Sequence, residues 1–221
     1  MSTKTWSSAG TFSWVVPDRV TSVTLCMIAA GGGGAENYSD ARYGGGYNGD
    51  MYQDKVYTTT PGSTITVVVG KGGAAGTTGS VANNKGKYGG DSKFGTLTRD
   101  GGKGGGITQG SYKGTGGTRP SNCMGTFKDG TSPGNNFWGG QGGFANGGNA
   151  GDNTKARKPG SRGSGGGGGD TRGGGNGKGG DGYIKITYTQ DPIPFEPIYV
   201  GTEQIREVRI GATKMKEFKI G

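Results

Sequence analysis

The sequence predicts an all-β framework interrupted by a long glycine-rich region. Short runs of apolar residues alternate with a period of two, and no run has the 3.6-residue period of an amphipathic helix. Glycine is concentrated in the middle, since 51 of the 55 glycines among the 221 residues lie within residues 31–182. The chain therefore divides into an apolar head, a glycine-rich middle and a short tail.

The expected strands frame the glycine-rich middle. Residues 11–16 and 20–30 alternate apolar and polar side chains on either side of a turn at Pro17-Asp18. Residues 64–69 repeat the pattern after Pro61-Gly62, with residues 55–60 as the expected hairpin partner, and Phe94 and Leu97 mark a weaker run. The last run, 183–188, follows the final glycines, so we expect the first and last strands to close the region like a clasp.

Three interpretations compete for residues 70–182. A collagen helix requires glycine at every third residue, and the runs at 165–169 and 173–175 break that frame. Disorder is the usual state of glycine-rich sequence with few large apolar residues. The aromatic residues Phe127, Phe137 and Trp138 argue against a flexible linker. Packed polyglycine helices are therefore favoured, and disorder is the alternative. In such helices the N–H and C=O groups point outward and bond neighbouring helices.

The composition excludes several kinds of chemistry. The chain has no histidine and two cysteines, so imidazole catalysis and a zinc site built from cysteine alone are excluded. Cys26 lies in an apolar run and is expected to be buried. The glycine–lysine pairs are never followed by Ser or Thr, so no phosphate-binding P-loop is present. We expect no enzyme, no metal and no cofactor, and the scattered aspartates are only a weak hint of glycoside hydrolysis.

Aromatic and basic side chains are the candidates for ligand contact. Aromatic faces stack on sugar rings and anchor interfaces, although the same residues are equally expected to pack against the glycine helices. The candidates for receptor contact are Tyr38, Tyr43, Tyr47, Tyr52, Phe137, Trp138 and Phe144. The net charge is +9, and a basic stretch is either a solvated face or a contact for polyanions, with candidates Lys155, Arg157, Lys158, Arg162 and Arg172.

The tail contains a repeat of ten residues. After a proline-spaced linker at 191–197, Gly201, Gly211 and Gly221 recur at this interval. The apolar residues at equivalent places are Ile198, Val200, Ile205, Val208, Ile210, Met215, Phe218 and Ile220. The pattern is typical of short strands and tight turns. A repeat array this short cannot cover its own apolar face. Residues 198–221 are therefore expected to dock on another protein or to oligomerise.

Five motifs in order resemble the glycine-rich domain of bacteriophage tail-fibre and minor tail proteins. They are TF…VP…VTSVT within 11–24, AAGGGG at 29–34, PGSTITVVVGKGG at 61–73, GGDSKFG at 89–95 and GGDGYIKI at 179–186. The resemblance implies a small β-sandwich clasping a polyglycine-II helix bundle over residues 1–190, with distal loops that contact the bacterial surface. The tail is similar to decapeptide strand repeats at the ends of phage minor tail proteins.

The sequence thus leads to a virion protein of the tail tip or tail fibre, made in the host cytoplasm, that binds the host surface. The expected partners are other phage tail proteins and a bacterial surface polysaccharide or outer-surface protein. The resemblance also implies a homotrimer or attachment to a trimeric fibre. A structural spacer or lid is the alternative. Binding to nucleic acid and insertion into a membrane are not expected, because one Arg-Gly-Gly triplet is too little for RNA and no run of 18 apolar residues occurs.

Overall fold

A computed structural model describes residues 1–35, 46–77, 85–105, 163 and 177–190, together with the backbone of four short strands between residues 198 and 214. The chain divides into two units, Met1–Gln190 and Asp191–Gly221, and each is described by itself. Every regular element in the described residues is a β-strand, which confirms the predicted all-β class.

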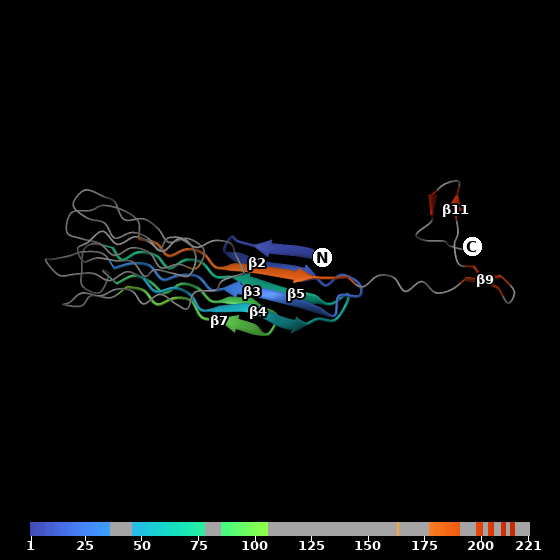
Figure 1. Cartoon of the computed structure of the whole chain (residues 1–221). Helices are drawn as coiled ribbons and strands as arrows, with labels where there is room; N and C mark the ends of the chain where they lie inside the picture. The colour runs from blue at the N-terminus through green and yellow to red at the C-terminus, as the bar shows by residue number, and fades with distance from the viewer. Residues whose placement is uncertain are drawn as a thin grey trace. The chain divides into compact units, whose positions relative to one another are not determined.

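The first unit contains two four-stranded antiparallel sheets (Figure 1). One sheet has the order β1 (Ser2–Trp6), β8 (Tyr183–Tyr188), β3 (Ser22–Ile28) and β4 (Met51–Thr58). The other has the order β2 (Gly10–Val15), β5 (Thr64–Val69), β6 (Ser92–Phe94) and β7 (Leu97–Arg99). Strands β3 and β8, which precede and follow the glycine-rich region, are neighbours, with Met27 opposite Ile184. The predicted first strand, residues 11–16, forms β2 of the other sheet and does not pair with β8.

The predicted hairpin between 55–60 and 64–69 is wrong. Strand β4 pairs with β3, whereas β5 pairs with β2 and β6, so the Pro61-Gly62 turn carries the chain from one sheet to the other. The turn at Pro17-Asp18 also joins strands of different sheets. Both crossings allow the inner face of each sheet to cover the same core. The hydroxyl of Thr59 joins the two crossings by donating a 2.7 Å hydrogen bond to the carbonyl of Val20.

Three further strands, β1, β6 and β7, differ from the sequence prediction. Strand β1 was not predicted because only its last residue, Trp6, is buried, and an exposed edge strand carries no alternating apolar pattern. The weak run around Phe94 is two strands, β6 and β7, joined through Gly95. Gly95 has a φ of 57° in this turn, a left-handed conformation that favours glycine.

The buried side chains of the two sheets form one hydrophobic cluster around Phe94, which has no exposed surface. The ring of Phe94 lies 5.3 Å from the ring of Tyr57 in an edge-on contact, and 6.0 Å from Trp14, centroid to centroid. Cys26 is buried, as predicted. This aromatic core fixes the relative position of the sheets and hence of the segments that leave them.

In the second unit the backbone forms two short antiparallel hairpins. Strand β9 (Ile198–Val200) pairs with β10 (Glu203–Ile205), and β11 (Arg209–Ile210) pairs with β12 (Thr213–Lys214). The residues between the paired strands include Gly201 and Gly211, the equivalent glycines of the ten-residue repeat. The ten-residue repeat therefore coincides with a recurrence of paired short strands.

Candidate functional site

The glycine-rich segments are direct continuations of the strands. Three segments leave the sheets, with 29–35 following β3, 70–77 following β5 and 100–105 following β7. Three return to them, with 46–50 leading into β4, 86–91 into β6 and 177–182 into β8. All six extend from the same end of the two sheets (Figure 1). We call these six segments the glycine array.

The hydrogen bonds of the array repeat every three residues. The N–H groups of Ala29, Ala30 and Gly31 donate to the carbonyls of three different returning segments, at Asp50, Gly90 and Gly180. Three residues later Gly32, Gly33 and Gly34 donate to the same three segments, at Tyr47, Lys87 and Gly177. The residue number of the donor rises by three while that of the acceptor falls by three. The returning segments therefore run antiparallel to 29–35.

The two other leaving segments also bond to 29–35. Gly73 and Gly76 donate to the carbonyls of Gly31 and Gly34. In the same manner, Gly102 and Gly105 donate to Ala30 and Gly33. Segments 70–77 and 100–105 therefore run parallel to 29–35. All seven residues of 29–35 are buried, so this segment is the centre of the array.

Gly163 occupies the remaining side of the centre. Its N–H donates to the carbonyl of Asp181, and its own carbonyl accepts from Gly49. Gly163 therefore bridges segments 177–182 and 46–50. A Cβ added to Gly163 would press against the side chain of Ile28, at the end of β3.

Close backbone approach explains why the centre is glycine. A Cβ added to Gly32 would overlap the carbonyl oxygen of Lys103, and one added to Gly33 would overlap that of Ala74. In each case the neighbour is backbone, which cannot rotate away. The Cα hydrogens of these glycines point at carbonyl oxygens, a contact that adds weakly to the N–H hydrogen bonds.

The exposed side chains of the array recur every three residues. In segment 70–77 the exposed residues are Lys71, Ala74 and Thr77, while the glycines between them are buried. Segment 100–105 exposes Asp100 and Lys103, again three residues apart. One residue in three thus faces solvent, which is the repeat of an extended helix with three residues per turn.

The outward side chains are sorted by charge along the array. Four acids, Asp50, Asp91, Asp100 and Asp181, lie next to the strand ends. The residues three positions farther from the sheets, about 9 Å at the rise of an extended threefold helix, are Tyr47, Tyr88, Lys103 and Lys178. A mainly acidic layer at the base, which also contains Lys71, is therefore followed by a layer of tyrosines and lysines.

Two of the acids bind backbone of a neighbouring segment. Asp181 Oδ1 accepts a 2.8 Å hydrogen bond from the N–H of Gly72, and Asp91 Oδ1 accepts one of 3.0 Å from Gly101. They are the aspartates of the Gly-Gly-Asp motifs at 89–91 and 179–181, and the repeated motif was the signal for this role. Sequence reasoning treated these carboxylates as scattered and missed it. Asp181 also forms an ion pair with Lys178, with a nitrogen–oxygen distance of 3.7 Å.

The predicted receptor residues are not brought together in the described part of the chain. Tyr47 is 37% exposed on the array. Tyr52 lies in β4, packs against the core, and has the guanidinium carbon of Arg99 3.5 Å from its ring centroid. The remaining five, Tyr38, Tyr43, Phe137, Trp138 and Phe144, lie outside the described residues, as do the basic candidates Lys155, Arg157, Lys158, Arg162 and Arg172.

The tail candidates are described only in part. Four of them, Ile198, Val200, Ile205 and Ile210, belong to strands of the second unit, and Val208, Met215, Phe218 and Ile220 lie outside the described residues. Sequence reasoning also missed exposed residues of the array, namely Lys71, Lys87, Tyr88 and Lys103. The three-residue spacing between exposed positions was the signal that would have found Lys71 and Lys103.

A shallow groove of about 420 Å³ lies where β4 ends and β5 begins. Its walls carry hydroxyl groups and no charged side chain, from Tyr57, Thr58, Thr59, Thr60, Ser63, Thr64, Ile65, Thr66 and Gly95. The hydroxyl of Ser63 donates a 2.6 Å hydrogen bond to the carbonyl of Thr60, and Thr59 is bonded to Val20, so part of this polar lining is already engaged.

Within residues 1–35, 46–77, 85–105 and 177–190, no three His, Cys, Asp or Glu side chains gather as metal ligands. The same part of the chain contains no helix long and apolar enough to span a membrane.

Comparison with known proteins connects this architecture to one family. The family model described as a glycine-rich domain matches residues 6–189, which include the whole array and every strand of the two sheets except Ser2–Thr5 of β1. No curated protein matches the chain.

Proposed function

The chain belongs to the glycine-rich domain family, and from this premise we propose that it is a bacteriophage minor tail or tail-fibre tip protein that binds the surface of the host bacterium without catalysing a reaction. Its location would be the virion, after synthesis in the host cytoplasm. The expected receptor is a surface polysaccharide or an outer-surface protein. The motifs that support the phage assignment are those of 29–34, 61–73, 89–95 and 179–186.

The proposal includes a finer description of the fold, a small β-sandwich clasping a polyglycine-II helix bundle. The supporting observations are the three-residue repeat of the inter-segment hydrogen bonds and the exposure of one residue in three. Polyglycine-II helices form no internal hydrogen bonds, so their N–H and C=O groups must bond neighbours. The bonds from Gly31 to Gly180 and from Gly34 to Gly177 have this character.

One observation carries the recognition role: three described segments of the array stop, and three resume, at positions remote from the sheets. The described segments stop there at residues 35, 77 and 105 and resume at 46, 85 and 177. The intervening stretches include the candidates Tyr38 and Tyr43 and the basic residues 155–172. A scaffold of strands and close-packed backbone whose connections carry the candidate side chains suits recognition, because binding residues are commonly carried by loops on a rigid base.

The tail gives the proposal its second partner. Two-stranded hairpins such as β9–β10 and β11–β12 are marginal in isolation and gain stability from further strands or packing. We therefore propose that residues 198–221 dock on another tail protein or on further copies of this chain, either as a homotrimer or on a trimeric fibre.

A structural spacer or lid is the alternative function. The observation that favours it is the number of backbone contacts in the array, since interlocked segments such as 29–35 and 86–91 form a stiff support that needs no ligand. The two functions differ in what the far end of the array contacts. An adhesin exposes it to the host, whereas a spacer packs it against neighbouring subunits.

Binding of the labelled full-length protein to bacterial cells and to their purified wall polysaccharides tests the proposal. We expect saturable binding to the host strain that Tyr38→Ala and Tyr43→Ala weaken. The variant Val15→Ala is the matched control, because Val15 is an exposed apolar residue on β2, away from the array. No binding to cells or polysaccharide, together with full infectivity of phage carrying both tyrosine changes, contradicts the adhesin function. A low-resolution image of the virion then shows whether the far end is covered, as a spacer requires.

A further inference from the structure

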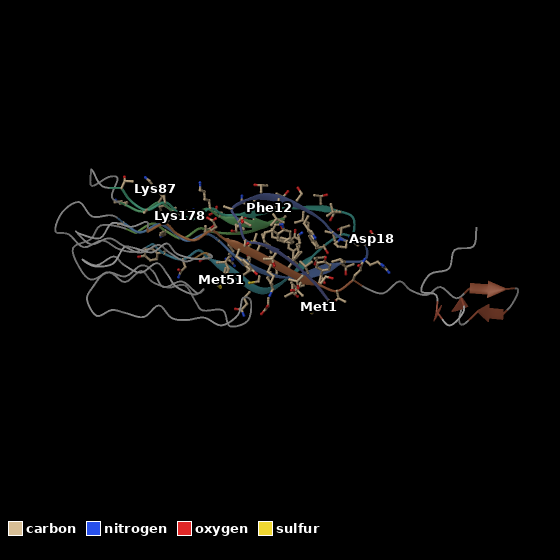
Figure 2. All side chains as sticks on the ribbon, turned by 90° about the horizontal axis from the view of Figure 1, so that it is seen from above. Met1, Phe12, Asp18, Met51, Lys87 and Lys178 are labelled. Carbon is tan, nitrogen blue, oxygen red and sulfur yellow. The ribbon has the colours of Figure 1, made fainter. Side chains whose placement is uncertain are left out.

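Two lysines and two tyrosines lie side by side on the flank of the glycine array. The residues are Tyr47, Lys87, Tyr88 and Lys103, and we call them the Tyr–Lys belt. All four are exposed, and Tyr88 has 68% of its surface open to solvent. Lys87 projects from the array toward solvent in Figure 2. An exposed tyrosine in a layer that is otherwise polar has no packing role to explain it.

Backbone hydrogen bonds set the belt in register. The N–H of Tyr47 donates to the carbonyl of Lys103 at 2.8 Å, so these two residues are direct neighbours on adjacent segments. On the other side of segment 100–105, Gly86 donates to Gly105 and Gly89 donates to Gly102. Those two bonds bracket Lys87 and Tyr88 along their segment, while the N–H of Lys87 itself donates to Ala74 of segment 70–77. The belt therefore runs across three adjacent segments.

The two lysines of the belt have no ion-pair partner in the described part of the chain. The ion pair described in the array joins Lys178 to Asp181, on a different segment. The nearest acids along the chain, Asp100 for Lys103 and Asp91 for Lys87, belong to the acidic layer at the base, and Asp91 accepts its hydrogen bond from Gly101. The lysine charges are thus available to an external anion.

The belt combines the two features that recognise an anionic sugar polymer. Tyrosine rings offer a flat apolar face to the carbon–hydrogen face of a sugar ring. Lysine ammonium groups attract carboxylate or phosphate groups. We propose that the Tyr–Lys belt binds an anionic polysaccharide along the flank of the array. This inference rests on the proposed recognition of a bacterial surface and names its ligand class.

The charge arrangement favours a polysaccharide over a nucleic acid. Double-stranded DNA carries about one charge per 1.7 Å, and single strands are held in grooves with continuous positive charge. The belt offers only two unpaired lysines among the described residues, with the acids Asp50 and Asp100 about 9 Å from Tyr47 and Lys103 along their segments. That acidic layer repels a densely charged strand more than a polymer whose anions are separated by neutral sugar units.

Titration of the full-length protein with hyaluronate oligosaccharides, which carry one carboxylate per disaccharide, and with poly(glycerol phosphate) tests the proposal. Neutral dextran and a single-stranded oligonucleotide are the comparison ligands. We expect binding to at least one anionic probe, weakened by added salt and absent for dextran. Tyr88→Ala and Lys103→Gln are each expected to weaken it by about two- to tenfold.

Matched controls are Lys55→Gln and Lys93→Gln, exposed lysines on β4 and β6 outside the array. Circular dichroism and the unfolding midpoint check that every variant folds. No binding to either anionic probe, or equal loss in belt and control variants, overturns the proposal. Tighter binding of the oligonucleotide through the same residues would make the belt a nucleic-acid site, and this result also overturns the polysaccharide proposal.

The cell-binding experiment separates this inference from the proposed function. If the belt variants bind host cells as well as the unchanged protein does, the belt is not the surface that binds cells, and the adhesin function is unaffected. Binding of an anionic probe through the belt by a protein that binds no cells leaves the belt as a polysaccharide site and contradicts the adhesin function.

Discussion

The carboxylate of Asp181 accepts a 2.8 Å hydrogen bond from the backbone N–H of Gly72, a residue 109 positions earlier in the chain. The bond joins the segment that leaves β5 to the segment that enters β8, so it links the two sheets through the glycine array. Asp91 forms the equivalent bond to Gly101. Carboxylates thus complete a network that is otherwise built from backbone alone.

Replacing Asp181 tests this role. Asp181→Ala removes the acceptor from the Gly72 N–H, and we expect a loss of about 1–2 kcal/mol in the free energy of unfolding, since hydrogen bonds to charged groups contribute about 1.5–3 kcal/mol and this site is partly exposed. Urea denaturation measures it. Asp181→Asn keeps a side-chain oxygen and is expected to recover part of the loss. If Asn is as destabilising as Ala, the hydrogen bond is not the source of the effect.

Replacing Gly33 tests the close packing at the centre of the array. The Cβ of Gly33→Ala would overlap the carbonyl of Ala74, and overpacking of this kind costs about 1–3 kcal/mol or more. We expect a lower unfolding midpoint and a lower yield of folded protein. The control is Gly62→Asn, because Gly62 has open space around its Cα and a φ of 76° that asparagine tolerates. An unchanged midpoint for Gly33→Ala contradicts the observed separation of the segments.

Replacing Ser92 tests the junction between the sheets and the array. The Ser92 hydroxyl accepts from the N–H of Gly70 at 3.0 Å and donates to the carbonyl of Ile28 at 3.1 Å, and the side chain is fully buried. Ser92→Ala strands a buried donor, which costs about 1–3 kcal/mol. Ser63→Ala is the matched change at an exposed hydroxyl, and we expect it to cost less. Equal losses for the two variants, measured by denaturant unfolding, run against this account.

Replacing Phe94 tests the aromatic core. Its ring is fully buried and contacts Trp6, Trp14 and Tyr57. Removal of a buried aromatic ring costs about 3–5 kcal/mol, so we expect Phe94→Ala to destabilise the sheets strongly and to change tryptophan fluorescence. Phe12 is only partly buried against the same cluster, and Phe12→Ala should cost clearly less. The prediction fails if the order of the two losses is reversed.

Strands with an alternating apolar pattern were predicted well, because burial of one face leaves a direct trace in the sequence. Residues 183–188 were predicted as a strand and form β8, and Ile65, Val67 and Val69 face the core from β5 as their alternation indicates. The pairing of β5 was predicted wrongly. Apolar alternation says which face is buried but not which strand lies alongside, and here β5 pairs with β2 and β6.

The candidate site was predicted less well than the fold. Tyr47 was identified as a surface aromatic, but its neighbours in the Tyr–Lys belt, Lys87, Tyr88 and Lys103, were not. The four belt residues come from three segments that are separated along the chain, and only the hydrogen-bond register makes these segments neighbours. The role of Asp181 was hidden for the same reason, since its partner Gly72 is remote in sequence.

The sequence by itself determined the all-β class, the burial of Cys26 and the positions where glycine is concentrated, because each depends on residue type and local period. Tertiary structure decided the neighbours: that 29–35 is the centre of the array, that β4 and β5 belong to different sheets, and that Asp181 binds Gly72. Glycine has no side chain to encode a partner. In a region held by backbone hydrogen bonds, the choice of neighbours comes from the strands that anchor each segment and from the few side chains at its edge.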